Sequence, residues 1–380
     1  MSSRESVSAD AAERHEKAGN TVAATIKDIA KKTGLGLATI SSYLNGGNVR
    51  EKNRILIEAA IEELHFEVNE VARGLKTNQT KTIGVVIPEL NNVFCAEIIT
   101  GIEDIMRNHG YALVICDCRT DPIRECDAVE FLYRKRVDGL INMPVNQDGR
   151  HLKPFMDAGK PIVLLDRKLN GVDCDSVLVD NLEAAKQAVN IFLQNGHRRI
   201  GMIGGPPEIY TGQERLTGYR LGLMEAGITP EERLIALGDY TIRGGMRCMR
   251  ELIEHNPDMT AVFVANYEMT MGAVIGMNEM GIHMADDISV IGFDNGEFAR
   301  ACKPRLMIVS QPTREIAERA ADLMLTRLKE SANAKDEGAV SISRRRGRII
   351  KLPTSMTEGK SVRNITEKLW EQGAQMGVWL

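Results

Sequence analysis

The chain has 380 residues, 43% of them hydrophobic, which is enough for about two or three domains with apolar cores. The 48 lysines and arginines stand against 52 aspartates and glutamates, and the net charge of −4 argues against a protein that coats nucleic acid or membrane by bulk charge. A DNA-binding role would therefore need a local surface. The seven cysteines and seven histidines show no metal-ligand spacing, so we expect free thiols and no metal or cofactor.

The N-terminal segment, residues 1–24, is polar and rich in small side chains. It contains no apolar run like that of a signal peptide, and nothing later in the chain approaches the ~20 apolar residues of a membrane span. We expect a disordered extension, or a misjudged start, in front of a cytoplasmic protein.

The stretch KKTGLGLATISSYLNGG (31–47) could be mistaken for a phosphate-binding glycine loop. Such a loop follows a strand, whereas the apolar residues of 26–30 have helical spacing. Thr25 can cap that helix with Asp28 as a weak capping-box partner, and Gly34 suits the left-handed position that ends it. The pattern predicts a tight turn between two helices and excludes a nucleotide loop.

Two more helices are predicted, over residues 37–45 and 50–64. Apolar residues at helical spacing would join the three helices: Ala30, Leu35, Ile40, Leu44, Ile57, Ile61 and Leu64. A three-helix unit with an exposed second helix is typical of DNA-binding domains, although the pattern alone fits an unspecific helical bundle equally well.

From residue 82 to about 351, apolar strands alternate with helical patterns such as 94–109 and 215–226. This alternation predicts parallel sheets covered on both faces, and the length favours two α/β subdomains. The expected strands are 82–88, 111–117, 137–144, 161–167, 175–180, 199–205, 234–240, 261–266 and 287–294. Ligands bind beyond the carboxyl ends of such strands, where the polar residues Asp117, Asp166, Arg167, Asn266, Asp294 and Asn295 gather.

Longer motifs give a family resemblance. TIKDIAKKTGLGLATISSYLNG (25–46) and IEAAIEELHFEVNEVARGLKTNQTKTIGVVIPE (57–89) resemble the headpiece and hinge of the LacI/GalR family of bacterial transcription regulators. The later motifs KRVDGLI, GHRRIGMIGGP, ERLTGYRLGL, TAVFVAN and DISVIGFDN resemble the family's effector-binding core, in order. The resemblance spans about 25–356. It implies an all-α helix-turn-helix headpiece and an α/β core of two doubly wound parallel-sheet subdomains, like a type I periplasmic binding protein.

This organisation divides the chain as follows: extension 1–24, headpiece 25–68, hinge helix and linker 69–81, core 82–356 and tail 357–380. Within the core, the N-subdomain is expected over about 82–178 plus 311–340 and the C-subdomain over about 179–310 plus 341–356. In the tail, Val362, Ile365 and Leu369 have helical spacing, so a second dimerisation helix is conceivable. A tail that docks on the body or stays mobile fits as well.

The resemblance also implies the DNA contacts. Leu37, Ala38 and Ser42 fall where base-contacting side chains lie, and their chemistry suits thymine methyl groups plus one hydrogen bond. Residues that resemble backbone-contacting or hinge positions are Thr25, Thr39, Ser41, Asn45, Asn69 and Lys76. Leu75 would wedge between central base pairs in the minor groove. Each hydroxyl could equally be an ordinary cap or a solvated group. Two departures bear on docking geometry: Val68 where the family often has proline, and a loop GGNVRE that is one residue short.

For the effector, the matching positions are Phe94, Asp166, Arg215, Tyr240, Asn266, Asp294 and Gln311. Aspartate, asparagine and arginine beside aromatic rings suit a sugar or a sugar derivative. Two alternatives stay open, because Asp294 could cap a turn and Arg215 could pair with Glu214. Tyr267 stands where the family usually has aspartate, so no particular sugar is implied.

Together these features predict a repressor of carbohydrate genes, a homodimer or tetramer on a pseudo-palindromic operator, whose DNA affinity a small ligand changes by shifting populations. The alternative is a sugar-binding protein without DNA function. An enzyme would need a nucleophile–base pair or a metal cluster, and the sequence offers no such arrangement. The sequence does not choose the effector or the sign of its effect.

Overall fold

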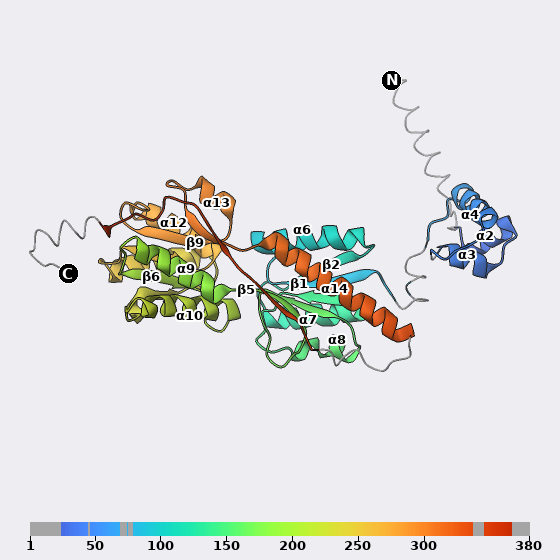
Figure 1. Ribbon diagram of the computed structural model, residues 1–380, viewed down its shortest axis with the longest axis horizontal. Coiled ribbons are helices and arrows are strands. Elements are labelled where there is room, and N and C mark those ends of the chain that lie inside the picture. Colours follow the sequence, from blue (N-terminus) through green and yellow to red (C-terminus); the bar gives the residue numbers. More distant parts are fainter. Residues whose placement is uncertain (1–23, 45, 69–73, 75–78, 337–345, 367–380) are drawn as a thin grey trace, which may run out of the picture. The chain divides into compact units, whose positions relative to one another are not determined.

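The computed structural model describes residues 24–44, 46–68, 74, 79–336 and 346–366 (Figure 1). The chain divides into two compact units, 1–80 and 81–380, and each is described by itself. The predicted disordered extension before residue 24, most of the predicted hinge helix, and the tail beyond residue 366 lie outside the described residues. So do Asn45, Asn69, Leu75 and Lys76.

The first unit contains three helices: α2 (Ile26–Thr33), α3 (Leu37–Leu44) and α4 (Glu51–Glu63). At the start of α2 the Asp28 carboxylate accepts the backbone N–H of Thr25 at 2.8 Å. Gly34 ends the helix at φ 70°, a left-handed conformation that glycine adopts without strain, and its N–H donates to the Ala30 carbonyl. Both features match the predicted turn. The core is formed by Ile29, Ile40, Ile57 and Ala60.

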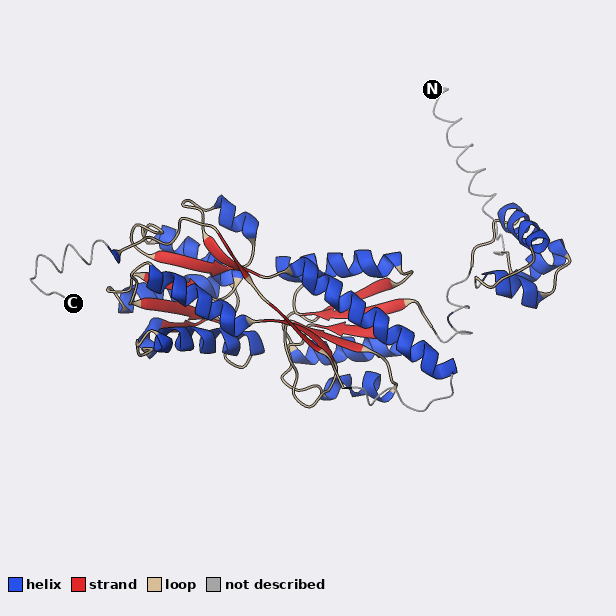
Figure 2. Ribbon diagram, viewed as in Figure 1, coloured by secondary structure: helices blue, strands red, loops and turns tan. Residues whose placement is uncertain are grey.

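The N-subdomain of the second unit is built on a six-stranded parallel sheet in the order β11-β5-β4-β3-β1-β2. Its strands are β1 (Thr82–Ile87), β2 (Ala112–Asp117), β3 (Gly139–Asn142), β4 (Ile162–Leu165), β5 (Asp175–Val179) and β11 (Ile349–Leu352). One apolar cluster joins one face of the sheet to α6 (Val93–Asn108) and α14 (Thr313–Asp336). A second joins the other face to α7 (Pro122–Arg134) and α8 (Lys153–Asp157), which follows a short 3-10 turn, Arg150–Leu152 (Figure 2).

The C-subdomain has a second six-stranded sheet, in the order β12-β10-β9-β8-β6-β7, in which only the β10–β12 pair is antiparallel. Its strands are β6 (Ile200–Gly204), β7 (Ile235–Leu237), β8 (Ala261–Val264), β9 (Ser289–Phe293), β10 (Met307–Ser310) and β12 (Ser355–Thr357). Helices α9 (Asn181–Gln194) and α10 (Tyr210–Glu225) cover one face. The other face carries α11 (Ile242–His255), α12 (Tyr267–Glu279) and α13 (Gly296–Ala301), and a 3-10 turn, Glu232–Leu234, precedes β7.

The chain crosses between the two sheets three times: after β5, after β10 and after β11. This corrects one predicted boundary, because β11 pairs with β5 in the N-subdomain sheet, whereas 341–356 was assigned whole to the C-subdomain. Only β12, beyond the third crossing, lies in the C-subdomain sheet. Strand β11 has only four residues, follows a basic run and contains an exposed lysine, so it lacks the longer apolar run by which the other strands were recognised.

The described part of the tail docks on the C-subdomain rather than forming a helix over residues 362–365. Ser361 is fully buried, and its hydroxyl accepts the Met307 N–H at 2.8 Å and donates to the Val290 carbonyl at 2.6 Å. The His197 ring approaches the Arg363 carbonyl at 3.0 Å. Of the alternatives for this segment, docking on the body is the one found up to residue 366.

Two absences concern the described residues alone. No helix there is both long and apolar enough to cross a membrane. Nor does that part of the chain bring three metal-ligating side chains together. All seven cysteines are free.

Candidate functional site

The exposed face of α3 is the candidate DNA interface. Ile40 points into the headpiece core with no exposed surface, which turns Leu37 outward with 47% of its surface exposed. Ala38 is also exposed, and Thr39, Ser41 and Ser42 are half-buried. Thr25 is exposed and is the N-cap residue of α2, where its N–H and hydroxyl both donate to Asp28.

A polar brace fixes α3 on α4. The Tyr43 hydroxyl donates to Glu58 Oε1 at 2.9 Å, and Arg54 donates to the same atom at 3.0 Å. This hydrogen bond raises the pKa of Tyr43. Arg54 also pairs with Glu51. The brace involves none of the outward side chains of α3, so that face is held in place without being covered.

The candidate effector site is a cavity of about 90 Å³ between the subdomains. It brings together three of the seven predicted effector residues: Phe94 from α6, Asp294 after β9 and Gln311 after β10. Asn295, one of the polar residues expected at the strand ends, also lines the cavity, and Tyr267 was noted only as a departure. Sequence reasoning missed the rest of the lining, which consists of Val93, Glu97, Gly296, Ser310 and Thr313. Two of the lining residues, Glu97 and Asp294, carry carboxylates, and no lysine or arginine is among them.

Asp294 and Gln311 form the polar centre of this cavity. The Gln311 Nε2 donates to Asp294 Oδ2 at 2.8 Å, and the Gln311 backbone N–H donates to Oδ1 at 3.4 Å. Burial raises the pKa of Asp294 to about 6, opposed by the nearby Arg215 guanidinium and the Gln311 bonds. Gln311 is 9% exposed, and its buried Oε1 has no hydrogen-bond partner among the described residues. A buried acceptor without a partner is costly unless a ligand or water satisfies it.

Arg215 lies behind this pair and is only 5% exposed. Its Nε donates to Asn181 Oδ1 at 2.8 Å, its Nη1 donates to the Ala265 carbonyl at 2.6 Å, and its guanidinium stacks 3.6 Å from the centre of the Phe293 ring. The alternative of pairing with Glu214 is not what the structure shows. These contacts hold the Arg215 guanidinium in a fixed position, so its positive charge stays near Asp294.

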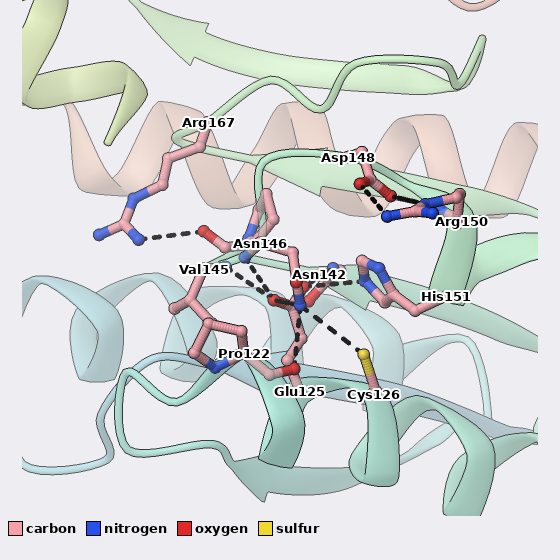
Figure 3. Close-up of polar contacts among 11 residues, drawn as sticks. Pro122, Glu125, Cys126, Asn142, Val145, Asn146, Asp148, Arg150, His151 and Arg167 are labelled. Carbon is pink, nitrogen blue, oxygen red and sulfur yellow. Dashed lines mark hydrogen bonds and ion pairs between the residues drawn. The ribbon is translucent and has the colours of Figure 1, made fainter. Parts of the chain in front are cut away.

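Asp166 follows β4 with a positive φ of 65°, and its side chain lies 3.4 Å from Arg167 Nε. Its Oδ1 is buried without a hydrogen-bond partner among the described residues. Asp166 also acts on the pKa of Asp294, which it raises through like charge. Arg167 in turn donates from Nη1 to the Pro144 carbonyl at 3.0 Å, so the loop after β3 positions the Arg167 side chain (Figure 3).

The loop after β3 is organised by Glu125, a residue that the sequence did not single out (Figure 3). This carboxylate from α7 is fully buried. It accepts hydrogen bonds at 2.7 to 3.0 Å from the Asn142 side chain, the backbone N–H groups of Val145 and Asn146, the Asn146 amide and His151 Nε2. Burial alone would raise the pKa of Glu125, but the bonds from His151, Asn142 and Asn146 outweigh it and lower the pKa to about 2. Five bonds to one anion make this loop a preformed element.

The other two predicted effector residues, Tyr240 and Asn266, are not part of the cavity lining. Tyr240, at φ 62°, places its hydroxyl 3.3 Å from Thr211 Oγ1 and does not line the cavity. Asn266 caps α12, accepting the Met269 N–H at 2.9 Å, and donates to Glu268 Oε2 at 2.7 Å. Its neighbour Tyr267 does line the cavity, with its ring edge-on to Phe298. None of these placements tests ligand contact, so the seven positions stay predictions.

Comparison with known proteins agrees with this architecture. Residues 25–69 match the family described as bacterial regulatory proteins, lacI family, and residues 189–351 match the periplasmic binding protein-like domain. The transcriptional repressor PurR of Edwardsiella ictaluri is 35% identical over 316 residues, covering 80% of this chain and 90% of PurR. The chain belongs to the LacI family of bacterial regulatory proteins.

Two solved structures extend the match. A complex of the transcriptional regulator CelR with cellobiose is 28% identical, covers 89% of this chain and 99% of its own, and superposes with a TM-score of 0.65. The lac repressor dimer bound to operator and the anti-inducer ONPF is 25% identical, covers 90% and 99%, and gives a TM-score of 0.75. The chain is a DNA-binding transcriptional repressor of the LacI family, and the match over its headpiece favours this over a sugar-binding protein without DNA function.

Proposed function

We propose that this LacI-family repressor responds to a small, uncharged, polyhydroxylated ligand, a sugar or sugar derivative, bound at the cavity of Phe94, Asp294 and Gln311. The observation that carries the proposal is the unpartnered, buried Oε1 of Gln311 beside the Asp294 carboxylate. Two adjacent acceptors suit the paired hydroxyl donors of a sugar, and the Phe94 ring offers an apolar face. No step of this role requires catalysis.

Charge supports a neutral ligand over a sugar acid or a sugar phosphate. The described cavity lining contains Glu97 and Asp294 and no basic side chain. Arg215 lies near Asp294, but its Nε and Nη1 are already bonded to protein oxygens. An anionic ligand would meet two carboxylates without a free basic partner in the lining, which is unfavourable. Genes of carbohydrate metabolism are accordingly the proposed targets.

On the DNA side we infer that Leu37, Ala38 and Ser42 contact base edges in the major groove, with Thr25, Thr39 and Ser41 on the phosphate backbone. Their exposure or half-burial on a braced helix supports this placement. Asn45, Asn69, Leu75 and Lys76 are proposed as further DNA contacts from the family resemblance alone. The residues from 25 to 81 include nine basic and seven acidic side chains, so a single headpiece would bind weakly.

Weak headpieces favour two copies on a pseudo-palindromic operator. Strand β2 is an edge strand of the N-subdomain sheet and leaves Ile115 41% exposed, which supports, as part of the proposal, a homodimer that covers this edge.

Two measurements test the proposal. Selection of the purified chain against random duplex DNA should recover a palindrome with a central pyrimidine–purine step, the kind of step that kinks easily. Titration of ribose and cellobiose, monitored by calorimetry, should then give binding that Asp294→Ala abolishes while affinity for the recovered operator is kept. A sugar response that survives Asp294→Ala would place the effector site elsewhere.

A further inference from the structure

Glu268 makes a polar bridge between the two subdomains. Its Oε1 accepts the Asn92 Nδ2 at 2.6 Å, and its Oε2 accepts the Asn266 Nδ2 at 2.7 Å. Asn92 immediately precedes α6 of the N-subdomain, and Asn266 immediately precedes α12 of the C-subdomain. One half-buried carboxylate therefore joins the starts of two helices that belong to different sheets.

Each asparagine is also the N-cap residue of its helix. Asn92 Oδ1 caps α6 by accepting the Cys95 N–H at 3.1 Å, and Asn266 Oδ1 caps α12 by accepting the Met269 N–H at 2.9 Å. Because the two amide oxygens are held by the caps, the orientation of the two Nδ2 groups is fixed, and both of these groups donate to Glu268. The bridge adjoins the candidate cavity, because Val93 and Tyr267, the next residues after the two caps, line it.

We propose that Glu268 is a latch that holds the subdomains together in the ligand-free repressor and that must release Asn266 before an effector can bond this amide. The proposal rests on the proposed effector site and adds the way in which ligand is coupled to the subdomain contact. A ligand oxygen that accepts from Asn266 replaces Glu268 there, leaves it tied only to Asn92, and so weakens the bridge. Binding at the cavity and loosening of the bridge are then one event.

Asn92 offers a substitution that separates the latch from the helix cap. Asn92→Asp keeps an oxygen for the Cys95 N–H but replaces the donor to Glu268 with a second carboxylate oxygen, so the bridge becomes repulsive. Asn92→Ser keeps a cap of shorter reach and removes the donor. Asp121→Ser is the matched control, because Asp121 caps α7 of the same subdomain by accepting the Ile123 N–H at 2.8 Å and takes no part in the bridge.

The latch itself is tested without ligand, by amide hydrogen exchange on the full chain. Both Asn92 variants should speed exchange in residues 267–271 of the other subdomain by about threefold or more, since local opening governs exchange there. Glu268→Gln, a substitution in the C-subdomain, should likewise speed exchange in the N-subdomain, in residues 93–97. Changes confined to the substituted subdomain, as expected for Asp121→Ser, would overturn the latch.

The coupling is tested by calorimetric titration of the same variants with ribose and cellobiose. Asn92→Asp should bind whichever sugar the wild type binds about two- to tenfold more tightly, because Glu268 is then held by one amide instead of two. Equal affinity would overturn the coupling. If the wild type binds neither sugar while the cross-subdomain exchange changes are seen, the proposed sugar class fails and the bridge is reduced to a structural contact.

Discussion

The amide nitrogen of Gln311 donates to the Asp294 carboxylate at 2.8 Å. Asp294 follows β9, and Gln311 stands where the chain leaves β10 for the other subdomain. A residue on a connecting segment is thus bonded to a residue of the candidate site. Any ligand that bonds this pair acts directly on a segment that joins the two sheets.

Asp294 should make the stability of the core depend on pH. Burial raises its pKa from 3.8 to about 6, so the ionised form is the one that the fold disfavours. The contribution of Asp294 to the free energy of unfolding is therefore fully present below about pH 4. As the pH rises through 6 this free energy falls, by at most about 3 kcal/mol. Asp294→Asn should remove this dependence in urea unfolding measured from pH 4 to 7. Asp127→Asn, exposed on α7, controls for the lost charge and should leave the profile unchanged.

Glu125 should show the opposite pH dependence. Its pKa is lowered to about 2, so its stabilising bonds are present above its ordinary value of 4.5 and are lost as pH falls toward 2. At neutral pH, Glu125→Gln should cost about 2–4 kcal/mol, because the amide cannot accept all five hydrogen bonds. Glu130→Gln on the same helix removes only an exposed pair with Arg134 and should change the free energy of unfolding by less than about 0.5 kcal/mol. Equal effects of the two substitutions would contradict a structural role for Glu125.

The docked tail should contribute measurably to the C-subdomain. Ser361→Ala leaves the Met307 N–H and the Val290 carbonyl without their buried partner, and we expect a loss of about 1–3 kcal/mol in chemical unfolding. Ser355→Ala, at an exposed position of β12, should be close to neutral. A neutral Ser361→Ala would mean that the tail contact does not persist in solution.

The exposed face of α3 can be tested apart from folding. Leu37→Ala should weaken binding to the selected operator about fivefold to tenfold, as expected for the loss of an apolar contact to a base. The thermal unfolding of the headpiece should not change, because Leu37 lies outside its core. Ile55→Ala, on α4 with 56% of its surface exposed, should leave the affinity unaltered. Similar losses for both would mean that α3 is not the contacting helix.

The sequence predicted the parts of the fold that rest on long apolar patterns. All nine expected strands are present, as are the three headpiece helices and the turn at Gly34. Strands β10, β11 and β12 were missed because they have only three or four residues each, too few to give a pattern, so that pairing with a neighbouring strand defines them.

From the residues alone, the cavity lining was predictable only where a residue directly follows a strand, as Asp294 and Asn295 do, whereas Phe94 and Gln311 were predicted from the family resemblance. Asp294 was found in this way, and the pocket contains it. Glu268 and Glu125 were not found, because each lies within a helix and its partners are far away in the chain: Asn92 is 176 residues from Glu268, and His151 is 26 residues from Glu125. A local sequence pattern cannot predict the role of a carboxylate whose hydrogen-bond partners are distant in the chain.

The three crossings between the sheets limit how the two subdomains can be separated for expression. Each subdomain is assembled from non-contiguous stretches of chain, with β11 added to the first sheet after five of the six strands of the second have been made. No single cleavage point yields two complete halves, so expression of either subdomain alone requires a rejoined or circularly permuted gene. During synthesis, the N-subdomain sheet therefore lacks its last strand until residues 349–352 have been made.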